Sequence, residues 1–120
     1  MPNHFHAIWQ LHDGIKKEIF QRDLLKFTAR SILKFMQMNC DTLFESLKVN
    51  SIERQYQVWE RNSLSLDVYS EVFFLQKLNY IHCNPLQDKW KLAQIAQDYK
   101  YSSASFYETG MDEFGILTHY

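Results

Sequence analysis

The segment that most constrains the fold is Met1–Gln10, because it places two histidines two residues apart ahead of an apolar run. In a β-strand, side chains at i and i+2 leave the same face of the sheet. We therefore expect residues 3–11 to form a strand on which His4 and His6 point side by side. Two neighbouring imidazoles supply half of a divalent metal site.

The chain has 120 residues, enough for one small domain over 1–120, and 46% of them are apolar, so we expect a buried core. No apolar run approaches the roughly 20 residues that span a bilayer. No secretory leader is recognisable, and Cys40 and Cys83 do not form a disulfide framework. These features indicate a protein of the reducing cytoplasm with no membrane partner. The net charge of −1 means that DNA binding must depend on local clustering of cations.

Apolar periodicity predicts two long helices. The first covers about Lys16 to Met38, and the second begins near Ser70 and ends at about residue 83, because Pro85 removes a backbone donor. Residues 55–61 alternate as a strand does, so we expect them to pair with the first strand. Residues 42–48 are compatible with either a short helical turn or an irregular loop, and short helical turns are also expected within 86–98 and 99–107.

Four cations follow one another at i+4 spacing on the first predicted helix: Arg22, Lys26, Arg30 and Lys34. Residues with this spacing share one face of a helix. The row is compatible with a solvated outer face. It is also compatible with a row of phosphate contacts to DNA.

The end of the second predicted helix carries the residues that could complete a catalytic site. Tyr80 and Asn84 are four residues apart and share a helix face. The amide oxygen of Asn84 is a hard ligand that suits Mg²⁺ or Mn²⁺ beside two imidazoles. A divalent cation at His4, His6 and Asn84 would polarise a phosphodiester. Tyr80 could then attack it and form a covalent phosphotyrosine.

Four segments together resemble a known family, the HUH single-strand transposases with one catalytic tyrosine. These segments are MPNHFHAIW, VWERN, YIHCNP and DYKYSSASFY, which lie in the family's order between Met1 and Tyr107. The resemblance is strongest to REP-associated, insertion-sequence-200-like tyrosine transposases. Members of that family carry a further strand and helix before the Met-Pro pair, so the resemblance implies an N-terminally truncated chain.

The resemblance implies an α+β fold, in which a ferredoxin-like antiparallel sheet carries helices on one face and lacks the family's first strand and helix. It implies that His4 and His6 are metal ligands, that Tyr80 is the nucleophile and that Asn84 is the third ligand. The implied activity is cleavage and transfer of single-stranded DNA through a 5′-phosphotyrosine during DNA transposition.

The implied partner is single-stranded or hairpin DNA, for which three aromatic residues are candidate base-stacking groups: Trp9, Tyr56 and Trp59. The alternative for each of them is packing in the core. A second function also stays open, a non-catalytic DNA-binding remnant of a truncated transposase that uses the four cations of the first helix. The sequence also leaves open whether the chain acts as a monomer or a homodimer.

Overall fold

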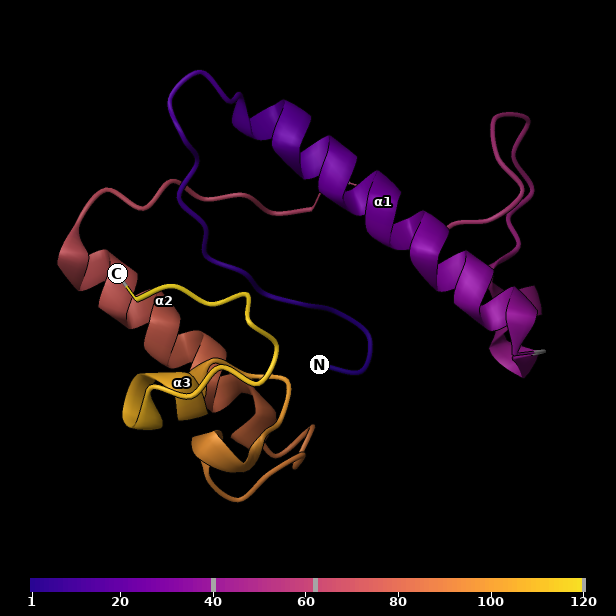
Figure 1. The fold of residues 1–120 in the computed structure, drawn as a ribbon. Helices are drawn as coiled ribbons and strands as arrows, with labels where there is room; N and C mark the ends of the chain where they lie inside the picture. The colour runs from indigo at the N-terminus through magenta and orange to yellow at the C-terminus, as the bar shows by residue number, and fades with distance from the viewer. Residues whose placement is uncertain (40, 62, 120) are drawn as a thin grey trace. The chain divides into compact units, whose positions relative to one another are not determined.

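The computed structural model describes the whole chain except Cys40, Asn62 and Tyr120. The chain divides into two compact units, one formed by Met1–Trp9 with Leu66–Tyr120 and the other by Gln10–Ser65. Figure 1 shows the α-helices of the described residues: α1 (Lys17–Met38) belongs to the second unit, and α2 (Glu71–Cys83) and α3 (Ala104–Thr109) belong to the first.

The longest element is α1, which spans Lys17–Met38 and confirms the first predicted helix. A turn leads into it, in which the Ile15 N–H donates to the His12 carbonyl at 3.2 Å. Gly14 lies inside this turn with φ +86°, a conformation that glycine adopts without steric cost. The turn therefore ends shortly before α1 begins at Lys17.

A 3₁₀ helix, η1, follows over Thr42–Leu47 and is capped by the Asp41 side chain, which accepts from the Leu43 N–H. The chain then folds back on itself, and the Val49 N–H donates to the Gln55 carbonyl at 2.9 Å. The Trp59 indole N–H donates to Thr28 Oγ1 at 2.9 Å and ties this returning segment to α1.

In the other unit, α2 spans Glu71–Cys83, and the Ser70 hydroxyl caps it by accepting from the Phe73 N–H at 3.2 Å. The prediction that α2 ends before Pro85 is confirmed, although the chain tightens there into a 3₁₀ helix, η2, over Asn84–Leu86. Proline fits this turn because its fixed φ suits the first residues of a helix, where its missing N–H is not needed.

Two short elements complete this unit. A 3₁₀ helix, η3, spans Ala96–Asp98, and α3 spans Ala104–Thr109 and ends at Gly110, which has a left-handed φ of +74°. Both α3 and α2 contact η3. The short helical turns expected within 86–98 and 99–107 are thus present, and η3 and α3 pack around the end of α2.

The prediction of a ferredoxin-like antiparallel sheet is wrong. The described residues contain no β-strand, and residues 3–11 have no regular structure. The predicted strand over 55–61 is reduced to a single antiparallel bridge between Lys48 and Tyr56. The physical reason is that this segment pairs with neighbours only a few residues earlier, which closes a much shorter loop than pairing with residues 3–11 would. Without a partner, a strand over 3–11 has no ladder to stabilise it.

The expected buried core is also small. Within the described part of the chain, Ala104 is the only buried hydrophobic residue, whereas Phe27 is 70% exposed and Val72 is 79% exposed. The two most deeply buried side chains are Asn84 and Pro85. None of the helices of the described residues has the length and apolar character needed to cross a membrane. The best-packed point of the molecule is therefore the end of α2.

Candidate active site

The rings of His4 and His6 meet although their segment is not a strand. Their centroids lie 5.0 Å apart, and the rings are nearly perpendicular, with an interplanar angle of 79°. In an irregular segment, the i, i+2 rule of a strand does not hold the two side chains together. Their shared neighbour on η2 does so instead.

That neighbour is Asn84, the first residue of η2, which is only 1% exposed. Its side-chain Nδ2–H group donates to His6 Nε2 at 2.9 Å and approaches His4 Nε2 at 3.4 Å. Its other polar atom, Oδ1, is buried and has no hydrogen-bond partner among the residues that the structure describes. A buried carbonyl oxygen without a partner carries a desolvation cost of about 1–3 kcal/mol.

A hydrogen bond from His4 to its neighbour orients the imidazole. His4 Nδ1–H donates to the Asn3 side-chain Oδ1 at 2.8 Å. A proton on Nδ1 leaves a free lone pair on Nε2, the atom that faces Asn84. Hydrogen bonds of this kind fix the tautomer of metal-binding histidines.

Burial and nearby positive charge lower the pKa of both imidazoles, which favours their neutral forms. The pKa of His4 is lowered by burial first, and then by the charges of the N-terminal amine and Lys89. The pKa of His6 is lowered by burial first, and then by the charges of His4 and the N-terminal amine. Neutral imidazole is the form that binds metal ions.

These three side chains fit a divalent cation. The described residues hold no cluster of three His, Cys, Asp or Glu side chains placed for a metal ion, and the polar side chain that lies beside the two imidazoles is the Asn84 amide. Metal–ligand bonds of about 2.1 Å place neighbouring ligands roughly 3 Å apart. The amide nitrogen lies 2.9 and 3.4 Å from the two Nε2 atoms, close to that spacing. Rotating the amide by half a turn would bring the unpartnered Oδ1 to the imidazoles, which suits a cation.

Tyr80 lies beside the same pair of histidines. It is one turn before Asn84 on α2, and its ring packs edge-on against the His6 ring with centroids 5.5 Å apart. The phenol is also 49% exposed, so a large substrate can reach it. The structure therefore brings together all four residues predicted for catalysis and metal binding: His4, His6, Tyr80 and Asn84.

Sequence reasoning missed two residues at the other end of the imidazole pair. The Trp90 ring packs against His4 with centroids 5.5 Å apart, and the Lys89 ammonium lies 5.4 Å from the Trp90 ring centroid. Both residues follow η2 in a loop that closes when the Leu92 N–H donates to the Pro85 carbonyl at 2.9 Å. Their spacing from Asn84 carries no pattern, and only the closed loop places them here.

His82 had no predicted role, and the structure gives it a structural one. A 2.9 Å hydrogen bond joins its Nε2 to Ser103 Oγ, and its ring packs against Tyr107. Burial lowers the pKa of His82. This link fixes the end of α2, which carries Tyr80, to the start of α3.

The predicted DNA-binding cations lie in the other unit, on α1. The side chains of Arg22, Lys26, Arg30 and Lys34 are all exposed. Among the described residues, Arg22 is the one of the four that forms a salt bridge, since it donates to Asp23 at 2.8 Å, and the charge of Lys26 also lowers the pKa of Asp23. The row is thus available to solvent along one helix.

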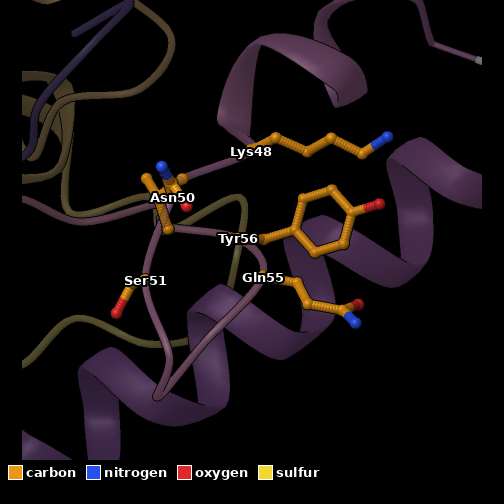
Figure 2. A pocket seen from close by; sticks show the side chains of 6 residues that line it. Lys48, Asn50, Ser51, Gln55 and Tyr56 are labelled. Carbon is orange, nitrogen blue, oxygen red and sulfur yellow. The ribbon is translucent and has the colours of Figure 1, made fainter.

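The unit of α1 also has an open hollow of about 410 Å³ (Figure 2). It is lined by Lys48, Val49, Asn50, Ser51, Gln55 and Tyr56. The Tyr56 ring already stacks on Phe44 with centroids 4.6 Å apart, and Trp59 is bonded to Thr28. Both aromatics, which the sequence left open as DNA-stacking groups, therefore take part in internal packing.

No protein-family model, characterised protein or solved structure matches this chain. Function must therefore be inferred from the chemistry of the site.

Proposed function

We propose that this chain cleaves and rejoins single-stranded DNA, as a transposase does, with Tyr80 as the nucleophile. The observation that carries the proposal is the contact of Tyr80 with His6 in the same cluster where Asn84 faces both imidazoles. Imidazoles whose pKa values are lowered by burial, beside a phenol and a buried amide, are typical of functional sites.

The chemistry that fits this cluster is in-line displacement at a phosphodiester. The Tyr80 oxygen attacks phosphorus and loses its proton to solvent, while the bond from phosphorus to the 3′-oxygen breaks and that oxygen takes up a proton. The products are a 5′-phosphotyrosine and a free 3′-hydroxyl. Attack by a 3′-hydroxyl on this ester reverses the reaction and joins a new pair of ends.

The other side chains of the site have separate proposed roles. His4, His6 and Asn84 would hold Mg²⁺ or Mn²⁺, which when bound would withdraw charge from the phosphate oxygens. Asn3 keeps the Nε2 lone pair of His4 directed into the site. The exposed position of Tyr80 lets a flexible single strand reach the phenol, which a paired duplex would do less readily.

The direct test is to incubate the protein with single-stranded hairpin DNA and Mn²⁺ and to look for a covalent adduct on a denaturing gel. We expect an adduct with the parent protein, none with Tyr80→Phe and none in EDTA. Tyr101→Phe is the matched control, because Tyr101 is a more exposed tyrosine of the same unit, and it should keep the adduct. Equal adduct in the parent and Tyr80→Phe, or none in either, would refute the proposal.

The exposed cation row favours a second function, binding of DNA without cleavage. Lys26, Arg30 and Lys34 are exposed and form no salt bridge within 4 Å among the described residues, and each could contact a phosphate. This function predicts hairpin binding that weakens steeply with salt and is unaffected by EDTA. Replacing Lys26 and Arg30 with glutamine should then abolish binding, and metal-dependent cleavage would argue against it.

A further inference from the structure

The four rings of the site form a series of contacts that has two different ends. Trp90 packs on His4, His4 on His6 and His6 on Tyr80, with successive centroid distances of 5.5, 5.0 and 5.5 Å. Tyr80 therefore contacts the His6 end of the imidazole pair, and Trp90 contacts the His4 end.

This order gives a direction to a bound strand, provided that the proposed function holds. In an in-line displacement, the leaving oxygen is on the opposite side of the phosphorus from the attacking oxygen. With Tyr80 attacking from one end, the 3′-oxygen and the nucleotide attached to it leave toward the other end. That end is occupied by Trp90 and Lys89.

The chemistry of these two residues matches a nucleotide. An indole ring stacks on any base, and a lysine ammonium pairs with a phosphate as a point charge. Lys89 is exposed and lies over the Trp90 ring, so its flexible side chain can move aside for a base and take up the adjacent phosphate. We infer that Trp90 and Lys89 bind the nucleotide on the 5′ side of the cleaved phosphate, the one released with a free 3′-hydroxyl.

Packing alone does not explain why the residue at position 90 is tryptophan. The indole Nε1 is buried and has no hydrogen-bond partner in the described part of the chain. A phenylalanine would fill much of the same space without leaving a buried N–H unpaired. The larger stacking surface of the indole is consistent with a role in binding a base.

The first test uses oligothymidine in EDTA, so that binding is measured without cleavage. We expect oligothymidine to quench tryptophan fluorescence in the parent and in Trp9→Leu, but not in Trp90→Leu, which should bind roughly tenfold or more weakly. Lys89→Gln should lower the slope of log affinity against log salt by about 0.7. Lys91→Gln is the matched control, because Lys91 is an exposed lysine of the same loop that pairs with Asp88.

The second test locates the subsite on the DNA. An abasic nucleotide placed 5′ of the cleaved phosphate should slow adduct formation by the parent protein. The same abasic nucleotide should not slow adduct formation by Trp90→Leu any further, because that variant already lacks the stacking ring. An unchanged quench in Trp90→Leu, or a Trp90-dependent loss only for an abasic nucleotide on the 3′ side, overturns the inference. Failure of the proposed function is distinguishable, because the Trp90-dependent quench would then persist while no tyrosine adduct forms.

Discussion

Replacing Asn84 with aspartate tests the geometry of the site directly, without any assumption about DNA. The amide nitrogen of Asn84 lies 2.9 Å from His6 Nε2, so the variant Asn84→Asp puts a negative charge about 3 Å from the imidazole. At that separation two unit charges interact by about 1.4 kcal/mol in water and by roughly 5 kcal/mol at an effective dielectric constant near 20. These energies correspond to about one and about four pKa units. His6 as a whole residue is exposed and its imidazole is only partly buried, so solvent screens the pair. We therefore expect the pKa of His6 to rise by about one to two units.

The variant also reverses how these histidines affect stability at low pH. In the parent, the pKa values of His4 and His6 are lowered in the folded state, so the unfolded chain binds more protons below about pH 6.5. The free energy of unfolding should therefore fall as pH decreases from 6.5 through the lowered pKa values. In Asn84→Asp this loss should shrink or change sign, because the carboxylate favours the protonated imidazoles.

The assay is a pH titration of the histidine Hε1 resonances by NMR in metal-free protein, combined with urea unfolding at several pH values. Asn79→Asp is the matched control, because Asn79 is an exposed residue of α2 that lies about 140° around the helix from Asn84. Unchanged histidine pKa values in Asn84→Asp, or equal shifts in both variants, would refute the placement of Asn84 between the imidazoles.

Metal binding by the same residue is a separate prediction. Asn84→Ala removes one of the three expected ligands, and we expect the affinity for Mn²⁺ to fall by at least about 10- to 100-fold. Electron paramagnetic resonance of free Mn²⁺ measures this directly. Equal affinity in the parent and Asn84→Ala would show that the amide is not a ligand.

Three further substitutions test contacts that hold each unit together. Ser103→Ala removes the hydrogen bond to His82 and should lower the free energy of unfolding by about 0.5–1.5 kcal/mol in urea titrations; an unchanged midpoint would contradict this role. Thr28→Val leaves the Trp59 indole N–H without its acceptor, and should cost about 1 kcal/mol and change tryptophan fluorescence. Gly110→Ala forces a side chain into a left-handed φ of +74° and should cost about 1 kcal/mol by thermal unfolding, whereas a gain in stability would refute the assigned end of α3.

The sequence was a good guide where structure depends on neighbours in the chain. The predicted helix from Lys16 to Met38 agrees with α1 to within one residue. The second predicted helix, which was expected to end before Pro85, agrees with α2. Apolar periodicity, an N-terminal serine cap and proline all act within a few residues. Such signals can be read from the sequence without knowing the tertiary fold.

The sheet could not be predicted in this way, because strand pairing is not local. Strand-like patterns occur over residues 3–11 and 55–61. Such a pattern does not specify which segment a strand will pair with. In the structure, Gln55 bonds to Val49, only six residues away, and residues 3–11 form no ladder. Pairing of residues 55–61 with the nearby segment around Val49 therefore replaced the expected pairing with residues 3–11.

The residue types of the site were readable from the sequence, because imidazole, amide and phenol groups define a chemistry wherever they lie. Their convergence was decided by the tertiary structure, since His4 and His6 lie in an irregular segment and both face the buried Asn84 side chain, which is distant from them in the sequence. Trp90 and Lys89 reach His4 only because the loop after η2 closes on Pro85. Local sequence therefore specifies the helices and the functional groups. Contacts between distant residues depend on the relative free energies of many alternative pairings, which a short sequence pattern does not give.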